Sequence, residues 1–336
     1  MRLLHTFKNF VGSYKLTQKI TSILSGDITI FCYHKVTNLK ANELIGTPDE
    51  DLAINTDVFE KHIKYIKDNF EIIDSYDLLD FEKISNIKKK KIVITFDDGY
   101  LDNLENALPI LKKYDAKATI FITTNFINDN ETPWWDRLWK ILDLKNNFSF
   151  NGKKFLLLHE NNNRKKLFEY LKSKFFLLKK DNQVDLFNKI LLENNIQLTN
   201  DKKRNFLNQE DIKKISLEKL IRIGSHTHNH QNLNILNKDE KIKEILISKK
   251  ILENITKKEI DLFAYPYGVK NAYHKNDSKI LKDNDFKLAF TTRFDNYKIQ
   301  SHSPYSIPRM GLGNNNDDKS IRDKVYGLDS MIKKIW

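Results

Sequence analysis

Short apolar runs rich in Ile, Val and Phe recur along the chain, and each has the length and composition of a buried strand. Between them, apolar residues recur at helical spacing, so that one face of each helix would lie in the core. Alternating strands and helices predict a parallel sheet, folded as a barrel or as a doubly wound sheet. The expected helices are 56–69, which Thr56 opens with a capping box, 103–114 and 239–254; the expected strands are 27–33, 91–96, 117–122, 220–223, 261–265 and 287–291.

The segment 128–206 departs from this alternation. It begins with Thr132-Pro-Trp-Trp-Asp136 and continues with helical patterns at 164–179 and 183–194. We interpret it as a helical insertion that lies over or beside the main domain. Its aromatic start is open to two interpretations, because flat ring faces suit the faces of a pyranose and can equally anchor the insertion to the domain. The residues concerned are Trp134, Trp135 and Trp139.

The rest of the chain divides into a main domain at 26–127 and 207–315, an N-terminal amphipathic helix at 1–25 and a C-terminal tail at 316–336. The basic N-terminal helix would either rest on a bilayer surface or pack against the main domain. We find neither the apolar run and cleavage site of a signal peptide nor the roughly 20 apolar residues of a membrane span. We therefore expect a cytoplasmic protein that can lie peripherally at the inner face of the membrane.

The chain is basic, with 57 Lys and Arg against 45 Asp and Glu, a formal net charge of +12. Such an excess can indicate nucleic acid or an anionic membrane as a partner. The lysines are spread among Asn and Ile residues, without a zinc-finger, helix-turn-helix or RNA-binding signature, so we expect no specific nucleic-acid partner. Cys32 is the only cysteine, which excludes an internal disulfide and a thiolate metal cluster. Its apolar strand predicts a buried structural thiol.

Acidic and imidazole side chains stand where predicted strands end. Asp97 and Asp98 close the strand at 91–96, while His226 and His230 follow the strand at 220–223. Two histidines and a carboxylate make a three-ligand site for a divalent metal, with a position left open for water. Neighbouring residues of a strand point to opposite faces, so one aspartate can bind metal while the other addresses water.

Each of these motifs also has a plain structural interpretation. An Asp-Asp-Gly sequence ends strands for reasons of turn geometry. If 226–230 is one helical turn, His226 and His230 share a face and His228 points elsewhere, but surface histidines can also cluster by chance. The combined pattern nevertheless favours metal-assisted hydrolysis.

Two further segments add candidate catalytic groups. Phe263-Ala-Tyr-Pro-Tyr-Gly268 ends a strand in a turn whose backbone N–H groups could face a developing oxyanion, or which is simply a rigid turn. His34 stands at the carboxyl end of the first strand, where parallel barrels gather their chemistry. It is either a general acid for a leaving amine or a histidine that is hydrogen-bonded at a strand end.

Three segments in this order resemble the polysaccharide deacetylases, the NodB-like carbohydrate esterases: Thr95-Phe-Asp-Asp-Gly99, Ser225-His-Thr-His-Asn-His230 and Phe263-Ala-Tyr-Pro-Tyr-Gly268. The strand that ends in Tyr33 and His34 resembles the branch of that family that acts on N-acetylated glycans. The resemblance implies an α/β fold, a distorted (β/α) barrel of about seven parallel strands. It also implies one Zn²⁺, or another divalent metal such as Co²⁺ or Ni²⁺.

Carried over by position, the resemblance implies Asp98, His226 and His230 as metal ligands and Asp97 as the general base for water. The backbone N–H of Tyr267 would help to hold the oxyanion.

Two departures from the family pattern matter. Many relatives carry an arginine in the third motif that pairs with the base aspartate, and Ala264 stands there in this chain. Arg309 can supply the guanidinium from another strand, or it forms a plain surface or structural ion pair. Many relatives also have a Leu-x-His acid near the C-terminus, which we do not find. In the branch that opens with a Tyr-His strand the acid histidine lies on the first strand, so the resemblance implies His34 for that role.

The resemblance implies hydrolysis of N-acetyl groups on an amino-sugar glycan or glycan precursor for surface polysaccharide synthesis. The N-acetylated saccharide would be free, lipid-linked or polymeric. Two alternatives stay open, namely a deformylase or other amidase on a lipid-linked amino sugar, and a non-catalytic glycan-binding protein.

Overall fold

The computed structural model describes residues 28–40, 52–80, 89–129, 131–157, 161–197, 204–299 and 301–330, with 26, 43, 50 and 82. The amphipathic helix predicted at 1–25 lies outside these residues. Among the described helices, none has the length and apolar content needed to cross a membrane.

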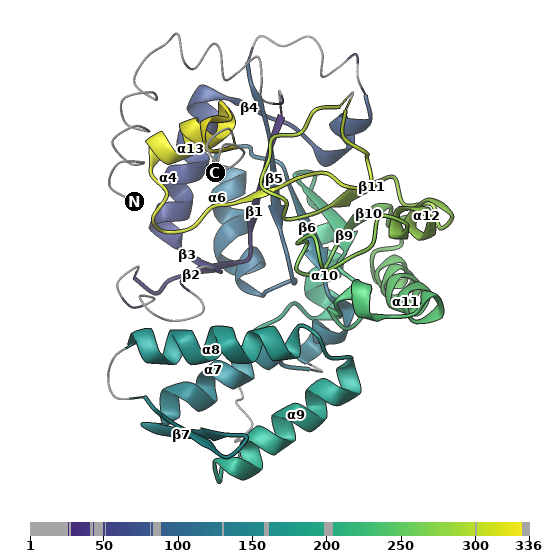
Figure 1. The fold of residues 1–336 in the computed structure, drawn as a ribbon. Helices are drawn as coiled ribbons and strands as arrows, with labels where there is room; N and C mark the ends of the chain where they lie inside the picture. The colour runs from purple at the N-terminus through teal and green to yellow at the C-terminus, as the bar shows by residue number, and fades with distance from the viewer. Residues whose placement is uncertain are drawn as a thin grey trace.

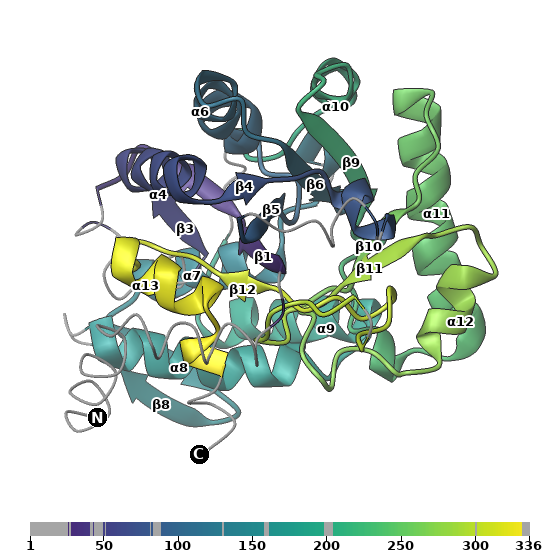
Figure 2. The ribbon, with the colours of Figure 1, turned by 90° about the horizontal axis from the view of Figure 1, so that it is seen from above.

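A parallel sheet curls around the centre of the molecule, with helices outside it (Figures 1 and 2). Ile307 pairs with Phe290 at one edge and Met310 pairs with Phe31 at the other, so the segment between them links the two edges. The predicted distorted (β/α) barrel is therefore confirmed. In spatial order the strands are β11 (Leu288–Phe290), β10 (Leu262–Ala264), β9 (Ile221–Ser225), β6 (Ala118–Ile122), β5 (Lys91–Phe96), β1 (Ile28–Tyr33) and β12 (Met310–Gly311), and β4 (Glu71–Ile72) pairs with the start of β5.

The central strands are buried along their whole length, which explains their unbroken apolar sequences. Outside the sheet lie α4 (Thr56–Asn69), α6 (Leu108–Lys113), α10 (Gln209–Ser216), α11 (Lys238–Thr256), α12 (Asp277–Lys282) and α13 (Asp318–Val325) (Figure 2).

Asn55, and not the predicted Thr56, caps α4. The Asn55 side chain accepts a hydrogen bond from the backbone N–H of Asp57 at 2.9 Å, whereas the Thr56 hydroxyl donates to the Thr37 carbonyl. Here Thr56 joins α4 to a small parallel pair, β2 (Lys35–Thr37) and β3 (Ala53–Asn55), which the sequence analysis did not anticipate.

Between β6 and α10, residues 131–157 and 161–197 form a layer of their own at one end of the barrel (Figure 1). We refer to it as the insertion. It has a separate apolar core, which includes Leu138, Leu171 and Phe187. The sequence pattern predicts helices alone in this segment, but the structure adds a hairpin that turns at Asn151–Gly152, both with positive φ. Its elements are α7 (Trp134–Leu144), β7 (Asn147–Phe150), β8 (Lys153–Leu156), α8 (Asn161–Phe175) and α9 (Lys180–Glu193).

Candidate active site

The carboxyl ends of the barrel strands bring the predicted site residues to one cavity of about 360 Å³. His34 follows β1, Asp97 and Asp98 follow β5, and His226 follows β9. The insertion leaves the barrel from the carboxyl end of β6, so it faces the same cavity and supplies its outer wall. The lining includes His34, Asp97, Asp98, His226, His230 and Tyr267 from the barrel, and Trp134, Trp135, Phe168, Glu169, Lys172 and Phe176 from the insertion.

Asp98, His226 and His230 form a buried triad whose donor atoms converge. Asp98 Oδ1 lies 3.6 Å from His226 Nε2 and 3.5 Å from His230 Nε2. Two ligands of a tetrahedral zinc ion at about 2.0–2.1 Å stand about 3.4 Å apart, so these separations fit a shared cation. Asp98 Oδ1 is buried and has no hydrogen-bond partner among the described residues. A buried carboxylate oxygen without a hydrogen-bond partner, placed between two imidazole nitrogens, fits the donor set of a divalent metal site.

The electrostatics of the triad support this fit. Burial, with a further contribution from the charge of Asp97, raises the pKa of Asp98 well above its usual range. Burial also lowers the pKa of His226 and of His230. The site therefore holds two neutral imidazoles, the form that binds metal, beside a carboxyl group that needs a nearby positive charge in order to ionise.

The loop after β9 is not the helical turn that the sequence analysis assumed. Thr227 and His230 have positive φ, and the loop brings the two imidazoles together by reversing direction. His226 Nδ1 donates to the Ala264 carbonyl at 2.8 Å, which leaves Nε2 free for a cation. His228 does point elsewhere, with its Nδ1 2.8 Å from the Thr124 hydroxyl.

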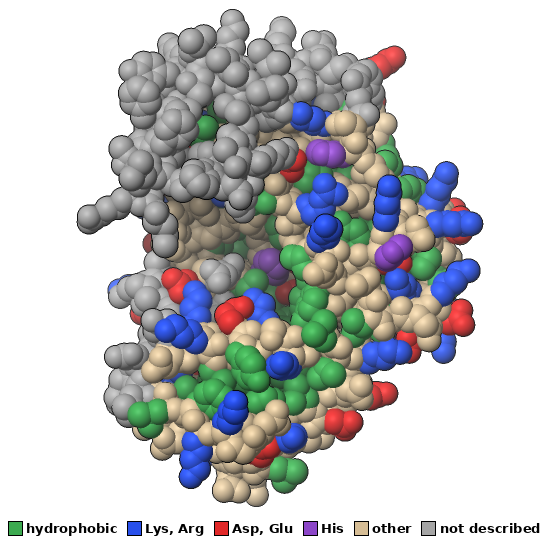
Figure 3. Space-filling view, viewed as in Figure 1, with side chains coloured by type: hydrophobic (Ala, Val, Ile, Leu, Met, Phe, Trp, Pro, Cys, Tyr) green, Lys and Arg blue, Asp and Glu red, His purple; other side chains and the backbone are tan. Residues whose placement is uncertain are grey.

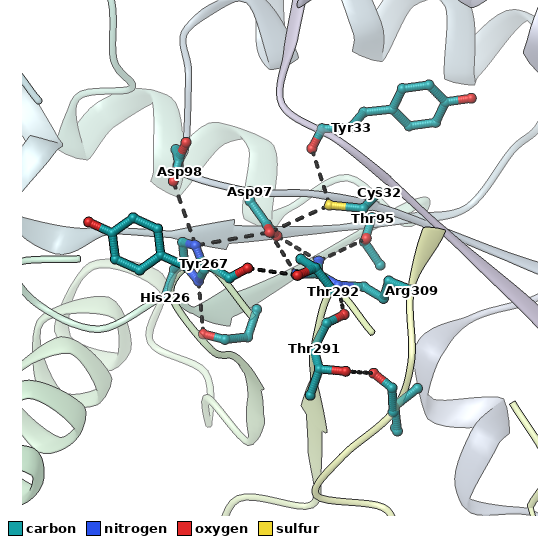
Figure 4. A network of polar contacts seen from close by, with 12 residues as sticks. Cys32, Tyr33, Thr95, Asp97, Asp98, His226, Tyr267, Thr291, Thr292 and Arg309 are labelled. Carbon is teal, nitrogen blue, oxygen red and sulfur yellow. Dashed lines mark hydrogen bonds and ion pairs between the residues drawn. The ribbon is translucent and has the colours of Figure 1, made fainter. Parts of the chain in front are cut away.

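Asp97 is held by a buried ion pair with Arg309 (Figure 4). The guanidinium donates Nη1 to Asp97 Oδ1 at 2.7 Å and Nη2 to Oδ2 at 2.6 Å, and its Nε donates to the Thr291 carbonyl. Arg309 is 1% exposed, which rules out a surface pair. Burial by itself raises the pKa of Asp97, but the charge of Arg309 and smaller contributions from His226 and His34 outweigh it. The pKa of Asp97 therefore lies well below its usual range.

His34 lies close to Asp97. Its ring nitrogen, a carboxylate oxygen of Asp97 and Cys32 Sγ lie within 4.8 Å of one another. This second group suits a cation poorly, because Asp97 is already paired and burial raises the pKa of the Cys32 thiol. Burial lowers the pKa of His34 to about 4, so His34 is neutral at neutral pH and must take up a proton before it can act as an acid.

The Pro-Tyr-Gly turn places Tyr267 in the lining of the cavity. Tyr267 has a positive φ of 61°, and its carbonyl accepts a hydrogen bond from the Thr292 hydroxyl at 2.7 Å. The backbone N–H of Thr292 in turn donates to the Gly268 carbonyl. The Tyr267 ring packs edge-on against His230 and Phe176, so it joins the barrel to the insertion.

Replacing Gly268 with alanine is expected to displace this turn. A Cβ at Gly268 would lie 2.4 Å from the Thr292 backbone nitrogen, and the residue has a φ of +61°. We expect a loss of about 1–3 kcal/mol in the free energy of unfolding, measured in urea, and at least about a tenfold loss of kcat. Gly311→Ala is the control, since a Cβ there meets no atom within 4 Å. Equal behaviour of the two variants would contradict the role given to the turn.

The sequence pattern did not predict that the insertion lines the cavity, although it singled out the tryptophans of the insertion. Trp134 lines the cavity, stacks on Phe175 with ring centroids 4.7 Å apart, and donates Nε1 to the Tyr267 hydroxyl at 3.4 Å. Trp135 is buried and donates to the Tyr100 hydroxyl, which anchors the insertion. Trp139 packs on Phe168 and lies away from the cavity lining. Trp135 thus anchors the insertion and also lines the cavity, and Trp134 likewise takes part in both packing and the cavity.

The family profile of the polysaccharide deacetylases matches residues 85–288. Two curated proteins match shorter stretches. YxkH of Bacillus subtilis is 33% identical over 102 residues, 28% of this chain. The poly-beta-1,6-N-acetyl-D-glucosamine N-deacetylase of Staphylococcus aureus is 32% identical over 81 residues, 24% of this chain. The matches span only 31% and 28% of the lengths of these relatives.

Solved structures share the fold over most of the chain. The Streptococcus pyogenes deacetylase PplD, in complex with acetate, superposes with a TM-score of 0.57 at 19% identity and covers 89% of this chain and 97% of its own. A polysaccharide deacetylase from Bacillus cereus superposes with a TM-score of 0.57 at 16% identity, over 89% of this chain and 68% of its own. At these identities the likeness concerns the fold alone.

Proposed function

Because this chain belongs to the polysaccharide deacetylase family, we propose that it is a metal-dependent hydrolase that removes N-acetyl groups from an amino-sugar glycan or glycan precursor. One observation carries the proposal beyond family membership. The oxygen Asp98 Oδ1, which has no hydrogen-bond partner among the described residues, lies between the Nε2 atoms of His226 and His230, beside Asp97, which is paired with Arg309.

In this proposal Asp98, His226 and His230 hold a divalent cation, Zn²⁺ or another such as Co²⁺ or Ni²⁺. When bound, the cation supplies Lewis-acid chemistry that activates water and polarises the acyl oxygen.

The remaining residues move protons and hold charge. Asp97 stays ionised because of Arg309, and it accepts the proton of the attacking water. The Tyr267 backbone N–H donates to the oxyanion that forms from the acetyl carbonyl. His34, which lies within 4.8 Å of Asp97, takes up a proton and delivers it to the nitrogen as the C–N bond breaks. The products are acetate and a sugar that carries a free amine.

The test is mass spectrometry of a panel of N-acetylated saccharides and lipid-linked intermediates, incubated with zinc-loaded protein. We expect a loss of one acetyl group per amino sugar and an equal amount of acetate. Release of formate from formamido sugars, without acetate release, would indicate a deformylase on the same scaffold. Undiminished glycan affinity without any turnover would indicate a glycan-binding protein.

Adding Zn²⁺ to metal-free protein is expected to raise its thermal midpoint. A ligand at about 100 times its Kd stabilises the folded state by about 2.7 kcal/mol. Asp98→Asn should largely abolish the shift, because the amide cannot supply the anionic ligand. His274→Ala, at an exposed histidine outside the cavity lining, should keep the full shift. Equal shifts in wild type and Asp98→Asn would contradict the assigned ligand.

A further inference from the structure

The insertion carries an exposed apolar groove between β7, α8 and α9. The groove encloses about 460 Å³, and Tyr170, Leu177, Leu178 and Leu186 are among its lining residues. Leu177 is 64% exposed and Tyr170 is 44% exposed. In Figure 3 apolar side chains gather over α8 and α9, below the hollow between the barrel and the insertion. An exposed apolar groove rimmed by polar groups is a candidate interaction site.

Helix α8 separates this groove from the active-site cavity. The active-site cavity is lined by Phe168 and Lys172 of α8 and by Phe176, the residue directly after the helix. The groove is lined by Tyr170 and Lys174. The two surfaces are thus two sides of one helix, and a helix with its side chains is about 10–12 Å across. Whatever occupies the groove therefore lies about one helix diameter from the cavity.

The charge around the groove favours an anionic partner. Residues 131–197 contain 13 Lys and Arg against 8 Asp and Glu. Lys174 and Lys189 stand in the groove lining. The Lys174 ammonium lies over the Tyr170 ring at 5.1 Å, and the Lys189 ammonium lies 3.9 Å from a carboxylate oxygen of Glu193. Aliphatic side chains flanked by lysines suit acyl chains below anionic headgroups.

We propose that the α8–α9 groove docks this protein on an anionic lipid bilayer and so holds the cavity about one helix diameter from the bilayer surface, within reach of an amino sugar carried on a lipid. The substrate part of this inference rests on the proposed function, while the docking part does not. A saccharide suits the groove less well, because sugars stack on open aromatic faces and the lysine ammonium of Lys174 covers the Tyr170 ring.

The experiment is flotation of the full chain with vesicles of phosphatidylcholine and phosphatidylglycerol, compared with vesicles of phosphatidylcholine alone. We expect binding to the anionic vesicles that falls with added salt. Leu177→Asp should weaken this binding by about tenfold or more, since it places a charge where a leucine would be buried. Lys174→Glu should weaken it by about fivefold or more.

The matched control is Leu217→Asp, the same change at a leucine that is 70% exposed on the barrel. It should bind vesicles as wild type does, and Leu177→Asp should hydrolyse a water-soluble substrate at the wild-type rate. If Leu177→Asp and Leu217→Asp bound the anionic vesicles equally, the proposal would be overturned. Failure of the wild-type protein to bind these vesicles would overturn it as well. A dimer in solution that Leu177→Asp dissociates would identify the groove as a contact between copies instead. Failure of hydrolysis alone would count against the proposed function and leave the docking result standing.

Discussion

Replacing Asp97 with asparagine is expected to lower kcat by about two to four orders of magnitude, the range attributed to a general base. The amide has the same shape and can keep a hydrogen bond to Arg309, but it cannot accept a proton from water. Because Asp97 is paired with Arg309 and lies outside the triad, the variant should still bind a divalent cation. The measurements are steady-state acetate release and the metal content of the purified protein.

Asp102→Asn is the matched control, an acid-to-amide change five residues further along the chain. Burial raises the pKa of Asp102 to about 7, so part of the Asp102 population is already uncharged at neutral pH. The asparagine side chain resembles this uncharged form. Asp102 does not line the cavity, and we expect no comparable loss of kcat. Turnover of Asp97→Asn at the wild-type rate would show that another group takes the proton. A loss of metal along with the activity would place Asp97 among the ligands.

The barrel and the location of its site could be predicted because both depend on local sequence. The strand β5 (Lys91–Phe96) has the predicted bounds, since each of its residues is buried and its run is unbroken. Side chains that follow parallel strands meet at one end of a barrel, so the position after the strand was enough to bring Asp98 and His226 together.

The parts that were missed depend on contacts between distant residues. Apolar spacing predicts α8, but it cannot show that Phe168 and Phe176 face the active-site cavity while Tyr170 faces away. The loop that joins His226 to His230 requires a positive φ at Thr227 and at His230, and neither residue type predicts that conformation. The hairpin at 147–156 did carry a signal, since Asn151-Gly152 is typical of a two-residue turn between short strands.

Replacing Arg309 with methionine is expected to lower the free energy of unfolding by about 3–5 kcal/mol, the usual effect of removing one partner from a buried ion pair. Arg309 is 1% exposed and makes two short hydrogen bonds to Asp97, so its loss leaves a carboxylate buried beside an apolar side chain. The double variant Asp97→Asn with Arg309→Met should recover part of the loss, because no uncompensated charge remains. The measurement is urea denaturation at neutral pH.

The effect of Arg309→Met should also depend on pH in a defined direction. In wild type the pKa of Asp97 in the folded state lies below its usual value, so the pair stabilises the protein above about pH 4 and this contribution declines as the pH falls further. Without Arg309, burial would raise that pKa, and the folded variant would bind a proton more tightly than the unfolded chain. The difference between variant and wild type should therefore be largest at neutral pH and shrink toward pH 4. Lys64→Met, which breaks an exposed pair with Asp68, should leave the urea midpoint unchanged at both pH values. A loss of stability in Arg309→Met that is the same at pH 7 and pH 4 would show that packing, and not the buried charge of Asp97, accounts for it.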